Sequence, residues 1–393
     1  HLEYTLINSI RKKNSDKQKI GLIYDHGETI DKHIYSFRKK ISEEHYDIED
    51  VKINEQLSAL KDYDCIIINN PTKYVTKKDL FIIDQFIMNG GKSIWIMNAT
   101  TATMDSLEEK GEMIVLPAKN RDLGYLNRSL FKYGVRINTE LIQDLESGFI
   151  PMRVGYDEKG QPRFELSEWP FFPAIIPTSK HEIVKNVKPI ITQFPSSIDT
   201  INNQVKKTIL LKTSANTKTT LVSPAALVSL ESVEQIDKKT FNGGEKNIGV
   251  LLSGTFTSAF SDNSEEFVHR MADYYKIEEE VSNNYMLVIS DPYFIKNQVA
   301  RGQPLPLGMD KWTGYSGGNG DFILNSLEYM LDDKELLAIR SKHGTTRLLD
   351  QNKRQNDQIY WQRINMFIPL IILAIIKLLF FIIRKRKYNS IKS

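Results

Sequence analysis

The chain has 393 residues, of which 41% are hydrophobic, and a formal net charge of +3 at pH 7. Its single cysteine, Cys65, excludes a disulfide framework within the chain. Six cations and no acids follow residue 363, which leaves a net charge of about −3 (+3 minus 6) for the rest of the chain. A nucleic-acid-binding body would be cationic, so we expect no nucleic-acid partner.

The amino-terminal third predicts alternating strands and helices. Short apolar runs predict strands over residues 19–24, 48–53, 64–69 and 93–97, and apolar residues at helical spacing predict helices over 30–41, 76–88 and 123–133. This alternation is typical of an α/β fold with a doubly wound, Rossmann-like sheet. Residues 1–149 are expected to form the first part of that domain.

Three polar residues, Asp25, His26 and Glu28, follow the first predicted strand. Open α/β sheets place ligands at the carboxyl ends of their strands, so these residues are candidates for ligand binding. An exposed polar turn is the alternative interpretation.

Other reactive residue types lack the spacing that their chemistry needs. Cys65 begins a predicted strand instead of following one, so we expect a small core residue rather than a nucleophile. The seven histidines show no spacing typical of a metal site. We therefore predict no metal and no other cofactor.

Beyond residue 149 the pattern changes. Prolines become frequent and apolar runs shorten over residues 150–248, which predicts a β-rich portion of short strands and turns. Buried-strand character returns at 249–253 and 285–290, and a helix is predicted over 321–331 with Asn319 as its cap. Residues 249–340 are thus expected to rejoin the α/β domain. The polar residues 341–363 are interpreted as a juxtamembrane linker.

Residues 314–318 match the G-x-S-x-G pattern of a hydrolase nucleophile, with Ser316 as the serine. That motif works because a strand delivers the serine into a strained turn and a helix follows at once. No strand is predicted before Ser316, so we interpret the segment as a glycine-rich loop and predict no catalytic residue. A periplasmic hydrolase that uses Ser316 or the turn at Asp25 and His26 is one alternative function.

Residues 364–383 are apolar almost throughout and precede four consecutive cations. A helix of about 20 residues extends roughly 30 Å, the thickness of the hydrocarbon core of a bilayer, so we predict a transmembrane helix. Cations are retained on the cytoplasmic side, which indicates a basic cytoplasmic tail over residues 384–393 and an extracytoplasmic body. A tail-anchored protein with a cytosolic body would instead carry the cations across the membrane. The cations are Arg384, Lys385, Arg386 and Lys387.

Three residues of this predicted helix are candidates for contact with a membrane partner. Pro369, together with Asn365, would permit a kink and a polar contact where helices pack. Lys377 would pair with an acidic group of a neighbouring subunit, or extend its side chain to the cytoplasmic boundary about 9 Å away.

An extracytoplasmic body requires an export signal. Residues 1–19 contain neither the apolar core of a signal peptide nor an initiating Met. We therefore expect a further segment upstream, either a signal peptide or a membrane helix.

A series of short motifs runs in order along nearly the whole chain. It consists of residues 2–4 (LEY), 10–12 (IRK), 133–138 (YGVRIN), 141–144 (LIQD), 249–260 (GVLLSGTFTSAF), 288–291 (VISD), 305–313 (LPLGMDKWT), 319–333, 347–350 (RLLD) and 384–388 (RKRKY). As a series, these motifs resemble the gliding-motility-associated ABC transporter auxiliary proteins, the GldG family of Bacteroidota.

The resemblance implies a periplasmic domain similar to the amidotransferase-like α/β fold but without its catalytic residues. It also implies an amino-terminal membrane segment and two partners, an ABC permease subunit and a separate ATP-binding subunit. The sequence departs from the family pattern at Ser253, where an acidic residue is expected, and after Asp291, which precedes Pro292 and Tyr293. Asp291 joins the candidate ligand-binding residues.

The sequence therefore favours a non-catalytic, membrane-anchored periplasmic accessory subunit of an ABC-type complex in the bacterial inner membrane. By resemblance, this complex is linked to gliding motility or protein secretion. The subunit would recognise an extracytoplasmic ligand or protein and contact membrane lipid, while a partner hydrolyses ATP. A purely structural component of an envelope scaffold is the second alternative.

Overall fold

The computed structural model describes residues 17–28, 31–44, 46–97, 99–118, 124–230, 236–261 and 276–331, and, nearer the carboxyl end, residues 363, 366–369, 372–374 and 376–378. The chain divides into two compact units, residues 1–343 and residues 344–393. All of the described strands belong to the first unit.

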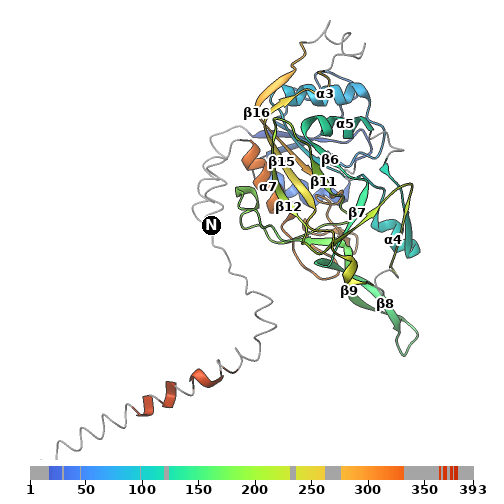
Figure 1. Ribbon diagram of the computed structural model, residues 1–393, viewed down its shortest axis with the longest axis vertical. Helices are drawn as coiled ribbons and strands as arrows, with labels where there is room; N and C mark the ends of the chain where they lie inside the picture. Colours follow the sequence, from blue (N-terminus) through green and yellow to red (C-terminus); the bar gives the residue numbers. More distant parts are fainter. Residues whose placement is uncertain are drawn as a thin grey trace, which may run out of the picture. The chain divides into compact units, whose positions relative to one another are not determined.

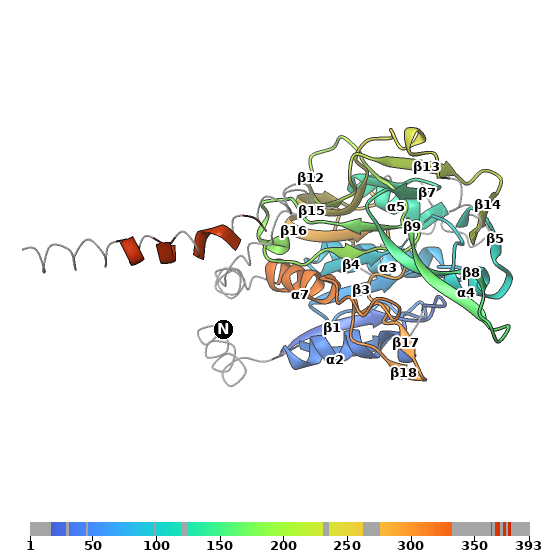
Figure 2. The same ribbon diagram turned by 90° about the horizontal axis from the view of Figure 1, so that it is seen from below.

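A seven-stranded sheet forms the centre of the first unit (Figures 1 and 2). Its strand order is β12-β15-β16-β4-β3-β1-β2, and the five strands from β16 to β2 run parallel. β15 and β12 extend the sheet in the antiparallel direction. The parallel strands are β1 (Gln18–Ile23), β2 (Tyr46–Val51), β3 (Cys65–Asn69), β4 (Lys92–Ile96) and β16 (Glu280–Ile289), and the antiparallel ones are β12 (Lys206–Lys212) and β15 (Asn247–Thr257).

Helices cover both faces of this sheet. One core cluster joins α2 and α7 to strand residues such as Ile67, and a second joins α3 and α5 to strand residues such as Ile66. Because successive residues of a strand point to opposite faces, the two pairs of helices lie on opposite sides of the sheet. The helices are α2 (Tyr35–Glu43), α3 (Lys77–Met88), α5 (Gly124–Tyr133) and α7 (Asn319–Met330).

A buried carboxylate holds two of these helices together. Asp84 on α3 accepts hydrogen bonds from the hydroxyls of Tyr133 (2.7 Å) and Ser258 (2.7 Å), from the backbone N–H of Ala259 (2.8 Å) and from the side-chain amide of Gln85 (3.1 Å). Burial raises the pKa of Asp84, and the hydrogen bonds oppose that rise. The carboxyl group therefore links α3, the end of α5 and the chain that follows β15.

The structure confirms a mixed α/β fold with a large sheet. The four strands predicted in the amino-terminal third are β1 to β4, and the bounds of each lie within two residues of the predicted ones. The helix predicted over 76–88 is α3, which begins after Thr76, whose side chain accepts a hydrogen bond from the backbone N–H of Asp79. The predicted cap of α7 is wrong. Gly318 is its N-cap, and Asn319 is already the first helical residue; the Asn319 side chain donates to the carbonyl of Phe294 over 3.1 Å.

Between β4 and β15 the chain is rich in short strands. A long hairpin of β8 (Ser147–Tyr156) and β9 (Pro162–Ile175) pairs with β10 (Ile190–Ile191), and an aromatic core that includes Trp169 and Phe194 lies beneath it. Paired short strands are β5 (Glu112–Val115) with β14 (Ala226–Ser229), β6 (Val135–Ile137) with β11 (Ile198–Thr200), β7 (Glu140–Asp144) with β13 (Thr217–Leu221), and β17 (Val299–Ala300) with β18 (Gln303–Pro304). The remaining helical turns are α4 (Met104–Lys110), η1 (Lys32–Ile34), η3 (Glu182–Val184) and η5 (Lys238–Thr240).

In the second unit, the described residues 363, 366–369, 372–374 and 376–378 are helical and exposed. No helix in the described part of the chain is both long and apolar enough to cross a membrane. The predicted transmembrane segment, 364–383, lies in good part outside the described residues, and so does the basic tail, 384–393.

Candidate functional site

The turn after β1 places His26 at the carboxyl end of the sheet. The backbone N–H groups of Thr72 and Lys73 donate to the His26 carbonyl over 2.9 and 2.7 Å, which fixes this turn against the loop after β3. Gly27 has a φ of +81°, and a Cβ at this position would lie 2.5 Å from Oγ1 of Thr72. The turn therefore requires glycine next to His26.

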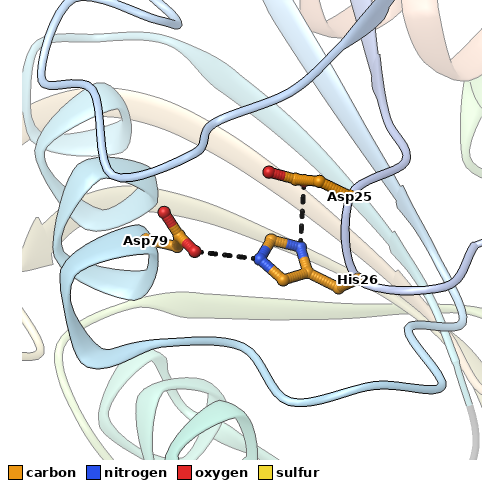
Figure 3. A group of neighbouring side chains, drawn as sticks. All are labelled: Asp25, His26 and Asp79. Atoms are coloured by element: carbon orange, nitrogen blue, oxygen red, sulfur yellow. Dashed lines mark hydrogen bonds and ion pairs between the residues drawn. The ribbon is translucent and has the colours of Figure 1, made fainter.

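The His26 ring lies among three carboxylates, two of which, Asp25 and Asp79, are drawn in Figure 3. Its Nε2 is 3.0 Å from Oδ2 of Asp79, at the start of α3. Its Nδ1 is 3.2 Å from Oδ1 of Asp25 and 3.7 Å from Oε1 of Glu28. The side chains of His26 and Asp79 are each 5% exposed, so the alternative of an exposed polar turn is wrong. We call these four residues the His26 cluster.

The carboxylates of the cluster also hold the backbone of the next loop. Oδ2 of Asp25 accepts from the N–H groups of Ile53 (2.8 Å) and Asn54 (3.0 Å), and Oδ1 of Asp79 accepts from Glu55 (2.8 Å). The loop after β2 is thus bound to the turn after β1 and to α3. The cluster ties together three segments that the parallel strands bring to one edge.

The proton on His26 determines what this cluster can do. Burial lowers the pKa of His26, but the carboxylates of Asp79, Glu28 and Asp25 outweigh it and raise the pKa to about 9. The pKa of Asp79 is lowered. Burial alone would raise it, but the hydrogen bonds from the His26 ring and from the backbone N–H of Glu55 outweigh that effect. His26 is therefore an imidazolium at neutral pH, with both N–H groups directed at carboxylates. It has no lone pair available for a general base.

The same geometry bears on metal binding. Ligand atoms of Asp25, His26 and Asp79 lie within 4.8 Å of one another, a spacing that could hold an ion. A metal needs the neutral imidazole, so it would have to displace a proton that three carboxylates hold. The residues therefore fit a proton better than they fit a metal. Asp79 was not predicted as a member of the His26 cluster, because it lies on α3, far from His26 along the chain. The signal that could have found it is the Thr76-x-x-Asp79 pattern, which is typical of a helix start and places a carboxylate in the first turn.

Asp291 lies apart from the His26 cluster. It follows β16, is 1% exposed, and its Oδ1 accepts from the backbone N–H of Tyr293 over 2.9 Å. The backbone N–H of Gln193 also donates to it. Burial raises the pKa of Asp291 to about 7, against these hydrogen bonds and the charge of Lys296. No described hydrogen bond or ion pair joins Asp291 to the cluster, so the residues predicted as one site form two.

Gln193 and Tyr293, whose backbone N–H groups donate to Asp291, also line a surface pocket of about 430 Å³. The pocket has mixed character, with aromatic, cationic and acidic side chains facing one space. We call it the Lys296 pocket. It is lined by Asp31, His33, Thr103, Met104, Asp105, Glu108, Gln193, Tyr293, Lys296, Asn297, Gln298, Val299, Lys311 and Trp312.

Most ionisable side chains of the Lys296 pocket have a partner within it. Nδ1 of His33 is 2.8 Å from Oδ1 of Asp31, and Nζ of Lys311 is 3.0 Å from Oε1 of Glu108. Lys296 differs, because its Nζ has no described ion pair and lies 4.9 Å from the centre of the Tyr293 ring. Burial lowers the pKa of Lys296, while nearby carboxylates oppose that shift.

The catalytic alternatives find little support in the described residues. Ser316 lies on an exposed loop, where it forms an isolated bridge with Met309, and no described histidine or carboxylate bonds to its hydroxyl. Cys65 is fully buried at the start of β3, and burial raises the pKa of its thiol. Of the predicted membrane contacts, Pro369 and Lys377 are described and exposed. Asn365 and the cations at 384–387 lie outside the described residues.

Comparison with protein families gives a match over residues 17–326 to the auxiliary family described as an ABC-type uncharacterized transport system. The chain belongs to this family. It is therefore an auxiliary component of an ABC-type transport system. No curated protein was found to match this ABC transporter auxiliary chain.

Three solved structures are distantly similar to this auxiliary protein. The mmIFT52 N-terminal domain is 11% identical with a TM-score of 0.44, over 80% of this chain and 97% of that one. A ThuA-like protein from Parabacteroides merdae is 10% identical with a TM-score of 0.36, over 80% and 90%. A GMP synthase component from Thermoplasma acidophilum is 8% identical with a TM-score of 0.32, over 83% and 100%. These scores are too low to assign a shared function.

Proposed function

We propose that this ABC transporter auxiliary protein is a membrane-anchored, extracytoplasmic binding subunit of the gliding-motility-associated GldG group of Bacteroidota. The observation that carries the proposal is the family match over residues 17–326. The apolar run at 364–383, followed by four cations, would anchor the body to the inner membrane with the tail in the cytoplasm. Gliding motility or protein secretion would be the process served.

The proposed mechanism is recognition without chemistry. The His26 cluster occupies the edge where related α/β sheets place ligands, but its imidazolium is already paired with carboxylates. No described hydrogen bond joins the Ser316 hydroxyl to a base, although Glu43 and Asp321 line the same pocket. A body of the amidotransferase-like type that has kept its sheet and lost its catalytic groups would account for both observations. ATP hydrolysis would then belong to a separate subunit.

The proposed helix would couple this body to the permease. Asn365 and Pro369 would contact a neighbouring helix in the outer leaflet, and Lys377 would face an acidic group or the cytoplasmic boundary. Binding outside would be transmitted through this packing to the ATP-binding subunit.

A pull-down from membranes tests the partners. The full chain, solubilised in detergent, is expected to bring down a multi-span permease and an ATP-binding subunit, both identified by mass spectrometry. A variant that ends before residue 364 is the control and should lose both. If the full chain recovers neither subunit, the transporter assignment fails.

A labelling experiment tests the topology. The only native cysteine, Cys65, is buried, so single cysteines can be introduced without removing it. Lys159→Cys, at an exposed position in the turn of the β8–β9 hairpin, should react with a membrane-impermeant maleimide in spheroplasts. Ser393→Cys should react only after lysis. The opposite pattern would support a tail-anchored protein with a cytosolic body.

A further inference from the structure

The Lys296 pocket lies where the fold brings chain segments together. Tyr293 and Lys296 follow β16, Thr103 and Met104 follow β4, and His33 belongs to the segment that follows β1. All three strands are parallel, so their carboxyl ends meet at one edge of the sheet, where open α/β folds bind ligands. The volume, about 430 Å³, is within the range of small-molecule sites.

Buried polar groups hold the wall of this pocket in place. Asn297 is 2% exposed; its side chain donates to the carbonyl of Lys32 over 2.9 Å and accepts from the N–H of Ser36 over 3.0 Å. Asp291, behind the pocket, accepts from the backbone of Tyr293 and Gln193. The lining residues are therefore positioned before any ligand arrives, which lowers the entropic cost of binding.

The unpaired charges specify the kind of ligand. Two ion pairs lie within the lining, Asp31–His33 and Glu108–Lys311. The other two charged residues of the lining, Lys296 and Asp105, have no described ion pair. The lining has as many carboxylates (Asp31, Asp105 and Glu108) as basic side chains (His33, Lys296 and Lys311), so it offers no excess of positive charge for a dianion such as a phosphate. A molecule that carries one negative and one positive group would complement Lys296 and Asp105, neither of which has a described ion pair.

The remaining lining adds an apolar surface. Tyr293, Trp312 and Met104 present aromatic and thioether groups to the same space. The Lys311 ammonium lies 4.7 Å from the centre of the Trp312 ring, which holds that ring against the wall. Such a surface favours a ligand with an aromatic or apolar side group.

We propose that the Lys296 pocket binds a small zwitterion with an apolar side group, an amino acid or a dipeptide, with its carboxylate at Lys296 and its ammonium at Asp105. A zwitterion of this kind is thus a class of ligand for the binding subunit proposed above. Binding itself does not depend on that proposal; the role of the ligand in the transport complex does. Binding is measured on the isolated full chain, so a failure here leaves the pull-down result untouched, and the reverse also holds.

Calorimetric titration of the detergent-solubilised full chain tests the proposal with a matched set of probes. L-phenylalanine or glycyl-phenylalanine is expected to bind, and the better of the two distinguishes an amino acid from a dipeptide. Phenylalaninamide, which lacks the carboxylate, and N-acetylphenylalanine, which lacks the ammonium, should each bind about tenfold or more weakly. If neither zwitterion binds at millimolar concentration, or if phenyl phosphate binds better than both, the proposal is overturned.

Variants assign each charge to its residue. Lys296→Gln should remove the preference for phenylalanine over phenylalaninamide, and Asp105→Asn should remove the preference over N-acetylphenylalanine. Lys212→Gln, on β12 and paired with Glu245 outside the pocket, is the control and should keep both preferences. A purely structural role would weaken all probes equally, and that outcome in both variants would also overturn the proposal. The probe series on the unaltered chain decides the matter if a variant does not fold.

Discussion

Nε2 of His26 lies 3.0 Å from Oδ2 of Asp79, although the two residues are 53 positions apart in the sequence. This contact joins the turn after β1 to the first turn of α3 at the carboxyl edge of the sheet. Both side chains are nearly inaccessible to water, so the pair forms in a medium that strengthens charge interactions. A histidine that looks like a ligand-binding residue in the sequence is thereby used to hold the fold together.

The raised pKa of His26 predicts how stability depends on pH. The pKa is 6.5 when the histidine is unperturbed and about 9 in the fold, so the native state binds the extra proton between these values. The resulting stability is complete below about pH 6.5 and is lost as the pH rises through about 9. We expect a loss of roughly 1–3 kcal/mol between pH 6.5 and 9.5, measured by denaturant unfolding.

His26→Gln is the control for this pH dependence. It should be less stable than the unaltered chain at pH 6.5 and should lose much less stability up to pH 9.5. Nitrogen chemical shifts of the His26 ring give an independent measurement, and they should report an imidazolium at pH 7.5. A neutral ring at that pH would contradict the interpretation.

The His26 cluster is expected to reject zinc at neutral pH. Binding would require the ring to release a proton whose pKa is about 9 and the carboxylates to give up their backbone partners. Competition with a zinc indicator at pH 7 should therefore detect no tight site that depends on these residues. Tight binding that disappears in both His26→Gln and Asp79→Asn would show instead that the cluster is a metal centre.

Asp291 is expected to make the protein less stable as the pH rises. Its pKa increases from 3.8 to about 7 on folding, so the native state holds an extra proton between these values. Stability from this group is complete below about pH 4 and is lost as the pH rises through about 7. Asp291→Asn keeps an oxygen acceptor for the N–H of Tyr293 but cannot become charged. The change that it causes in the melting temperature should therefore be more favourable at pH 8 than at pH 4.5, by about 2 °C or more. An equal effect at both pH values would contradict the prediction.

Asp84→Ala is expected to destabilise the fold by about 2–4 kcal/mol. The substitution leaves the buried hydroxyls of Tyr133 and Ser258 and the N–H of Ala259 without their acceptor. Denaturant unfolding measures the loss. Asp64→Asn, which alters an acceptor for the exposed N–H of Lys19, is the comparison and should cost less than about 1 kcal/mol. Similar losses for the two variants would mean that the buried network contributes little.

The parallel half of the fold was predictable because burial on both faces leaves a simple pattern. A run such as Ile66, Ile67 and Ile68 has few alternatives to a central strand. The β-rich portion was predicted only as a class. Its pairings, such as β7 with β13, join segments more than seventy residues apart (Thr217 with Asp144), and no local pattern specifies such partners.

Only part of the His26 cluster was predictable, because its last member, Asp79, also comes from a distant part of the sequence. The rule that ligands bind at strand ends led to Asp25, His26 and Glu28, but it does not distinguish a ligand from an internal ion pair. That distinction depends on Asp79, which reaches His26 only because α3 packs beside β1 and β3. Likewise, Lys296 has no sequence motif, and its importance follows from the pairing of the other cations in its pocket.

The position of β16 in the sheet has a consequence for biosynthesis. Ser93 of β4 pairs with Met286 of β16, which is 193 positions later (286 minus 93). As the chain emerges from the ribosome, the first four strands can assemble early, yet one side of β4 has no partner until β16 follows. An open strand edge invites association with other chains. Nascent copies would therefore need to be shielded by a chaperone until nearly the whole body had been made.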